Sequence, residues 1–337
     1  MPSRSSPIGV LVADAVLRPS RLVAGVFVLA LLLLLSAGPA RATFPGPNGR
    51  IAFADYLSGQ IYAVNPDGSA LRQLTHTGRK GFAGNPSWSA NGKRLLFERS
   101  RNVNTRIWVM RANGSHKHKV AGDAKGFQDF TPAYTPNGRR IVFTRCHPEP
   151  KDVCAIWKMR ANGRHKRALT PFVHSTKDEH NDFNPSVSPN GRWIAFGRFN
   201  AGGFAARVFI MRANGAHAHA VTAAPLEGFE PDWAPSGRRI TFTSQAPRPG
   251  SSIFTVRPDG SHLHQVTPSR FPHSDALSTY SPRGNRLAFI SDRKHPDACC
   301  NDLFTVKPSG GSGHLIHTGL TDAGIIQPSW GRAPLKH

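Results

Sequence analysis

One motif occurs six times along the chain at nearly even spacing. A glycine preceded by Asn, Ser or Arg recurs at intervals of 43, 46, 53, 46 and 47 residues. Internal repeats of about 20–50 residues are typical of solenoids and propellers, in which each copy forms one supersecondary unit. The fold is therefore expected to consist of six similar units, marked by Gly49, Gly92, Gly138, Gly191, Gly237 and Gly284.

Each copy predicts four short antiparallel strands. In the fourth copy the turn at 189–192 precedes an apolar strand at 194–196, a third strand carries Val208 and Phe209, and the turn at 212–215 leads into the last strand. Asn-Gly and Asp-Gly are strong hairpin signals, because glycine adopts the positive φ that tight hairpins need. The first strand of the unit lies ahead of the glycine turn and ends at Trp88, Tyr134, Val187, Trp233 or Tyr280.

Radial repetition of such units predicts an all-β fold, a six-bladed β-propeller of four-stranded antiparallel blades. The first copy begins at Pro47 with no strand ahead of it, whereas residues 327–330 form a strand-like segment that stands alone near the C-terminus. We expect this C-terminal strand to become the innermost strand of the first blade. The ring would then be closed without an open sheet edge.

The repeated sequence resembles the WD-repeat-like propeller repeat of TolB-type proteins. The resemblance is carried by Pro-Asn-Gly-Arg-Ile-Ala-Phe, by Ile-Tyr-Ala-Val-Asn-Pro-Asp-Gly-Ser and by Gln-Leu-Thr, and it extends over residues 47–331. It implies a six-bladed propeller associated with the cell envelope. TolB proper has a separate N-terminal domain, for which the sequence is expected to leave no room.

The first 42 residues have the features of a secretory signal peptide. Arg4, Arg18 and Arg21 precede an apolar run at 22–35, and the small residues Ala40 and Ala42 follow it. The run is short for a membrane span, which needs about 20 residues. We therefore predict a signal peptide at 1–42 and a propeller at 43–337, secreted or located in the periplasm or cell envelope, with a retained membrane anchor as the alternative.

Four cysteines follow the predicted signal peptide, and export would allow disulfides to form. Cys146 and Cys154 flank a loop between two predicted strands, so we predict a bond between them. Cys299 and Cys300 are adjacent, and a bond between them would close a strained ring. Their state is left open.

Familiar catalytic motifs are missing from the sequence. It contains neither Gly-x-Ser-x-Gly, nor His-Glu-x-x-His, nor a phosphate-binding loop. No catalytic residue and no cofactor are predicted. The alternative is an enzyme acting on an extracellular polysaccharide with a metal ion in the longest loop, where the weak candidate ligands are His174, Asp178, Glu179, His180 and Asp182.

Polar residues stand immediately before the predicted innermost strand in five of the six copies. Because propellers often bind ligands at the mouth of the central channel, we predict a binding site there. Its members are Asn85, Thr131, Asn184, Glu230 and Gln327.

Positive charge is concentrated in the turns. The segment after residue 42 retains 39 Lys and Arg against 19 Asp and Glu, and only Asp67 and Asp259 among these acids fall in the first or third turn of a copy. In a four-stranded blade these two turns lie on one face of the ring, and acids such as Asp129 and Glu227 are assigned to the opposite face. The predicted basic face comprises Lys93, Arg94, Arg139, Arg140, Arg164, Lys166, Arg167, Arg238 and Arg239.

These observations favour a secreted, non-enzymatic binding or scaffold propeller. We expect it to act as a monomer, to contact a protein partner at the channel mouth, and to contact an anionic polymer of the cell envelope through its basic face. Nucleic acid is not expected as a partner, because the chain carries an export signal and no stacking platform of aromatic residues.

Overall fold

The computed structural model describes residues 43–78, 81–101, 104–120, 126–147, 153–173, 180–200, 206–245, 250–268, 273–295, 300–320 and 324–334. Internal contacts divide the chain into residues 1–36 and 37–337, and all described residues belong to the second unit. The described ranges form strands and turns only. They include no helix with the length and apolar character required to cross a membrane.

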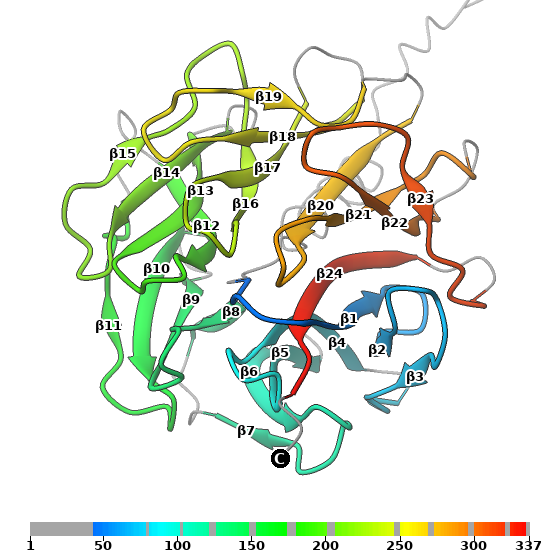
Figure 1. Cartoon of the computed structure of the whole chain (residues 1–337). Coiled ribbons are helices and arrows are strands. Elements are labelled where there is room, and N and C mark those ends of the chain that lie inside the picture. The colour runs from blue at the N-terminus through cyan, green and yellow to red at the C-terminus, as the bar shows by residue number, and fades with distance from the viewer. Residues whose placement is uncertain are drawn as a thin grey trace, which may run out of the picture. The chain divides into compact units, whose positions relative to one another are not determined.

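Six four-stranded antiparallel sheets are arranged as the blades of a propeller, as predicted (Figure 1). Blade 1 contains β24 (Ile325–Arg332), β1 (Asn48–Asp55), β2 (Gln60–Val64) and β3 (Arg72–Gln73), whereas blade 2 contains β4 (Gly81–Trp88), β5 (Arg94–Arg101), β6 (Asn104–Arg111) and β7 (His118–Lys119). Blade 3 contains β8 (Gln128–Tyr134), β9 (Arg140–His147), β10 (Val153–Arg160) and β11 (Arg167–Ala168).

The other three blades follow the same order from the inside of the ring outward. Blade 4 contains β12 (His180–Val187), β13 (Trp193–Asn200), β14 (Ala206–Arg212) and β15 (His219–Ala220). Blade 5 contains β16 (Phe229–Trp233), β17 (Ile240–Ser244), β18 (Ser252–Val256) and β19 (His264–Gln265). Blade 6 contains β20 (Asp275–Tyr280), β21 (Leu287–Ser291), β22 (Asp302–Val306) and β23 (His314–Leu315).

Aromatic pairs between the second and third strands recur through the core. Phe53 of β1 lies opposite Tyr62 of β2, with ring centroids 5.8 Å apart, and Phe242 of β17 stacks on Phe254 of β18 at 5.7 Å. Aromatic residues directly opposite each other on neighbouring strands stabilise a sheet. The repeated Phe of the sequence motif is therefore a packing residue, and its six copies are almost completely buried.

The ring is closed by the C-terminal strand, which confirms the predicted topology. β24 pairs with β1, and Trp330 Nε1 donates a hydrogen bond to the carbonyl oxygen of Gly49 (3.0 Å). Trp88 Nε1 of the neighbouring blade donates to the carbonyl oxygen of Ser329 (3.1 Å). The last strand is thus bound to both blades beside it.

The predicted disulfide is present. Cys146 and Cys154 face each other on β9 and β10 and are bonded. Cys300 is buried, and Cys299 lies outside the described residues.

Candidate functional site

The innermost strand of every blade contains a β-bulge, where the register to the second strand shifts. The residue at each bulge has φ between 45° and 57° and is only 0–5% exposed. These six bulge residues are Asn85, Thr131, Asn184, Glu230, Leu277 and Gln327. Five of them are the residues predicted to line the channel mouth, and Leu277 is the sixth.

The backbone N–H of a bulge residue does not take part in the regular ladder and needs another acceptor. In four blades a side chain of the preceding blade accepts this hydrogen bond. The donors and acceptors are Asn85 N to Gln327 Oε1 (2.6 Å), Thr131 N to Glu98 Oε2 (3.2 Å), Asn184 N to Thr144 Oγ1 (3.2 Å) and Leu277 N to Thr243 Oγ1 (3.0 Å). Polar side chains inside the ring therefore connect neighbouring blades.

Three of these acceptors occupy one position of the repeat, directly after the buried Phe of the second strand. Thr144 accepts the hydroxyl of Thr131 (2.8 Å) as well as the N–H of the next blade's bulge, and Thr243 donates its hydroxyl to Glu230 (3.1 Å). Glu98 holds the same position in blade 2. The other three copies have Ala54, Gly197 and Ile290, which offer no such acceptor.

Glu98 is a buried carboxyl group in this ring. Burial raises its pKa to about 7, although hydrogen bonds from the Asn85 side chain and the Thr131 backbone act in the opposite direction. Sequence reasoning did not select Glu98. The available signal was an acid at a position where the other copies carry Ala, Thr, Gly or Ile.

The segment ahead of β1 crosses the middle of the ring (Figure 1). Thr43 is 1% exposed and donates its hydroxyl to Asp232 Oδ2 (2.8 Å), which also accepts the backbone N–H of Tyr280 (3.0 Å). Phe44 belongs to the same buried apolar cluster as Tyr134. This segment is thus held by inner strands of several blades.

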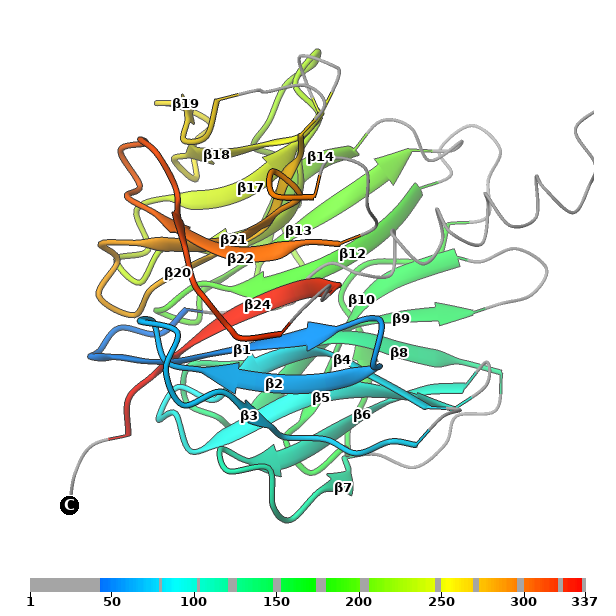
Figure 2. The same ribbon diagram turned by 90° about the vertical axis from the view of Figure 1, so that its right-hand side faces the viewer.

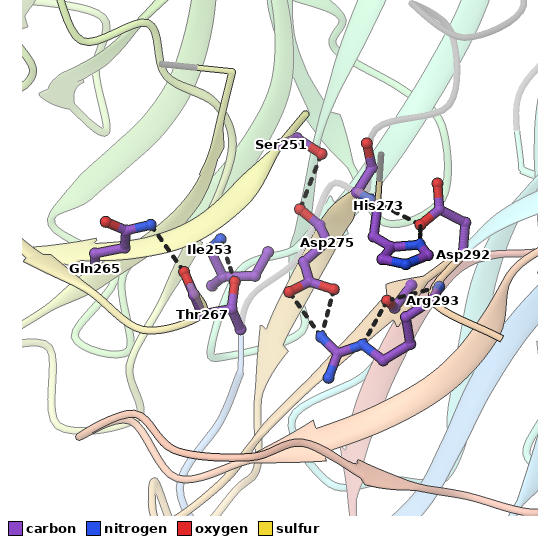
Figure 3. Close-up of polar contacts among 10 residues, drawn as sticks. Ser251, Ile253, Gln265, Thr267, His273, Asp275, Asp292 and Arg293 are labelled. Carbon is purple, nitrogen blue, oxygen red and sulfur yellow. Dashed lines mark hydrogen bonds and ion pairs between the residues drawn. The ribbon is translucent and has the colours of Figure 1, made fainter. Parts of the chain in front are cut away.

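In three blades a buried aspartate of the first strand forms an ion pair with an arginine in or just beyond the second strand. Arg145 donates to both carboxylate oxygens of Asp129 (2.7 and 2.9 Å), and Arg198 binds Asp182 at the same distances. In blade 6, Arg293 lies two residues beyond the end of β21 and donates to both carboxylate oxygens of Asp275 (2.6 and 2.8 Å; Figure 3).

Each of these three guanidinium groups lies over aromatic rings of its own blade. Arg145 stands 4.9 Å from the ring centroid of Trp157, Arg198 stands 4.6 Å from that of Phe209, and Arg293 stands 4.7 Å from that of Phe304. Contacts of a cation with an aromatic face are favourable, more so where water is excluded. Asp129 and Asp182 are therefore internal anchors and do not form an exposed acidic surface.

The metal candidates are only partly within the described residues. His174, Asp178 and Glu179 lie outside them. Both carboxylate oxygens of Asp182 bind Arg198, and His180 Nε2 is 4.0 Å from Asp182 Oδ2. In the part of the chain that the structure describes, no three His, Cys, Asp or Glu side chains are grouped to hold a metal ion.

The first and third turns of a blade lie together along the edge of the ring at which β24 ends (Figure 2). Backbone bonds connect them, such as Ala112 N to Lys93 O (3.0 Å) and Ala161 N to Arg139 O (2.9 Å). We call the side chains of these turns the turn surface. Its predicted basic members Lys93, Arg94, Arg139, Arg140, Arg164, Arg167 and Arg238 are exposed, and Lys166 and Arg239 are partly exposed.

The two acids of the turn surface are fixed within their own turns. Asp67 accepts hydrogen bonds from the hydroxyl and N–H of Ser69 (2.7 and 2.9 Å), and Asp259 does the same with Ser261. These hydrogen bonds lower the pKa of both carboxyl groups. Elsewhere on the described turns the charged side chains are basic.

No protein-family model matches the chain. A TolB homolog from Chlorobium luteolum is 29% identical over 133 residues, which are 39% of this chain and 28% of that protein. An uncharacterized protein from Agrobacterium fabrum is 31% identical over 83 residues, which are 25% of this chain and 27% of that protein. The matched segments thus span less than a third of either relative.

Two solved structures share the propeller. A putative TolB from Agrobacterium tumefaciens has a TM-score of 0.61 at 19% identity, covering 80% of this chain and 88% of that chain. TolB from Acinetobacter baumannii has a TM-score of 0.67 at 14% identity, covering 93% and 73%. With the blade order, the closing strand and the repeat sequence, these similarities identify the chain as a TolB-like six-bladed β-propeller.

Proposed function

We propose that this protein is an exported, non-enzymatic binding propeller that contacts an anionic polymer of the cell envelope through its turn surface. The observation that carries the proposal is the charge of that surface, where exposed Lys and Arg side chains gather and the two acids are bonded within their turns. An uncompensated basic surface attracts polyanions. A protein partner is proposed to bind at the channel mouth, beside the bulge residues, whose own side chains are buried.

Export is part of this proposal. It is supported by the apolar leader and by the disulfide between Cys146 and Cys154, which suits an oxidising compartment. Cell fractionation and mass analysis of the isolated protein would test it. A mature chain beginning at Thr43 outside the cytoplasm is expected, whereas a full-length cytoplasmic chain would refute it.

Dextran sulfate is a suitable probe for the turn surface. Its affinity should fall steeply as salt is added, because the Debye length shortens to about 8 Å at physiological ionic strength.

A matched pair of double variants separates a specific surface from overall charge. The first double variant, Arg139→Gln with Arg164→Gln, removes two exposed charges of the turn surface. The second, Arg101→Gln with Arg207→Gln, removes two exposed charges at the ends of β5 and β14 that point away from the turn surface. Only the first pair should weaken binding. Equal weakening by both pairs would show that net charge alone is responsible.

A further inference from the structure

A cleft of about 290 Å³ opens between blades 3 and 4 beside the turn surface. Its walls include the turn residues Asn137 and Asn190, and the buried side chains of Val142 and Ile194 also line it. Arg140 and Lys158 contribute the charged groups of the lining. All its lining residues belong to the described part of the chain, and none of them is acidic.

The strand register places three cations on one face of blade 3. Lys158 lies opposite Val142 on one side and Arg167 on the other, and Arg140 is two residues from Val142 along β9. Residues directly opposite, and residues two apart on a strand, project to the same face of a sheet. Arg140, Lys158 and Arg167 therefore share the face that borders blade 4.

Lys158 is the buried member of this cluster. It is 8% exposed, and its Nζ donates a hydrogen bond to the carbonyl oxygen of Ala213 in blade 4. Burial, and next the charges of Arg167 and Arg140, lower the pKa of Lys158 to about 8. These neighbours act as uncompensated positive charge at the cleft.

The other five blades show that a lysine is not needed here for packing. The equivalent residues of the third strands, also opposite the outermost strand, are Ala63, Val109, Ile210, Thr255 and Thr305. A small or apolar side chain thus suffices at this position of the repeat. Burying an ammonium group is costly unless a partner compensates its charge.

We propose that the cleft between blades 3 and 4 binds a phosphate group, with Lys158 and Arg140 as its principal ligands and Arg167 adding attraction. Lysine and arginine are the usual phosphate ligands of proteins, as a point charge and as a planar fork. This proposal rests on the proposed function, because the phosphate is expected to belong to the anionic polymer bound by the turn surface.

Calorimetric titration with inorganic phosphate at pH 7 and constant ionic strength tests the cleft. Wild-type protein should give a saturable isotherm for one site. Lys158→Val and Arg140→Gln should each weaken binding by about tenfold or more, as expected for the loss of a charge-assisted hydrogen bond. Lys158→Val installs the residue that blade 2 carries at this position, so the variant should fold.

The matched control is Arg94→Gln, which removes the equivalent exposed arginine of blade 2, where Val109 replaces the lysine. It should leave the phosphate affinity unchanged. Absence of a saturable signal, or an equal loss in Arg94→Gln and Arg140→Gln, would overturn the proposal. Because Arg140 is exposed, its variant keeps the test decisive even if Lys158→Val unfolds.

Dextran sulfate, which carries no phosphate, separates this proposal from the proposed function. If wild-type protein binds dextran sulfate in a salt-dependent manner but gives no phosphate isotherm, the cleft proposal is wrong and the turn surface stands. If phosphate binds as predicted and dextran sulfate does not, the cleft stands and the proposed function is wrong. If polyphosphate occupies the cleft at a lower concentration than inorganic phosphate does, the source of the phosphate is a polymer. If inorganic phosphate occupies the cleft at the lower concentration, the ligand is free phosphate.

Discussion

Two sets of residues in this propeller share a backbone conformation with positive φ, but one set is buried and the other is exposed. The bulge residues of the inner strands have φ of 45–57° and are buried. The residues that follow the third turns have φ of 53–57° and are exposed; they are Ala70, His116, His165, His217 and His262. L-residues seldom adopt positive φ, which costs about 1–2 kcal/mol in the left-handed region.

The surroundings explain the different residue types. At the bulges, side chains of neighbouring blades bind backbone N–H groups, and threonines of the same blade bind the side chains of Thr131 and Glu230. Polar residues occur at five of the six bulges, and Leu277 is the exception. At the third turns water surrounds the side chain, and histidine, a residue tolerated in this conformation, recurs in four copies. The histidines at 116, 165, 217 and 262 thus occupy positions whose left-handed backbone histidine tolerates better than most residues.

The largest effect should come from deleting residues 327–337. This deletion removes Gln327, the acceptor for Asn85, together with most of β24, so two sheet edges are exposed. Thermal unfolding should show a melting temperature lower by more than about 10 °C, or no cooperative transition. Deleting residues 333–337, beyond β24, is the control, and an equal small change in both would refute closure by β24.

Arg145→Met should cost about 3–5 kcal/mol, because it leaves the carboxylate of Asp129 buried without its cation. Arg99→Met is the matched control. Arg99 also lies over an aromatic ring, that of Trp108, but Ala83 occupies the place of the aspartate. Its loss should cost about 1 kcal/mol. Denaturant unfolding measures both, and equal costs would contradict a role for the buried pair.

Glu98→Gln should stabilise the protein at pH 8 by about 3 kcal/mol and leave it unchanged near pH 4. The folded state holds the proton up to about pH 7, whereas the unfolded chain releases it near 4.5. Wild-type stability is therefore lost as the pH rises between these values. Unfolding free energies at several pH values test this, and parallel profiles for wild type and variant would disprove a protonated Glu98.

The smallest effect is expected for Ala70→Gly, which should stabilise the fold by about 0.5 kcal/mol because glycine relieves the positive φ of 53°. Ala168→Gly, at an exposed site in β11 with ordinary extended backbone, should destabilise by a similar amount. Denaturant unfolding of the two variants gives the comparison. Destabilisation by Ala70→Gly would show that the turn tolerates the alanine without cost.

The repeat made most of the fold predictable. Glycine turns and alternating apolar residues are local signals, so six copies specified the blades, the closing strand and the hairpin that holds Cys146 and Cys154. Contacts between blades were harder to predict from the sequence. The bond from Thr131 to Glu98 and the burial of Lys158 depend on the neighbouring blade, which no single copy reveals. Asp129 was assigned to an exposed acidic face and Asp182 to a loop, whereas both are buried in strands and bind arginine side chains of the neighbouring strand.

If the chain is exported as proposed, the burial of Thr43 has a consequence for the order of events during export. A peptidase must take several residues on each side of its target bond in extended form, whereas Thr43 is 1% exposed and Phe44 is 5% exposed in the folded ring. If cleavage occurs after Ala42 as predicted, docking of Thr43 onto Asp232 and cutting of the bond compete for the same segment. Processing therefore has to come before the segment docks, and a chain that folds too early would keep its leader.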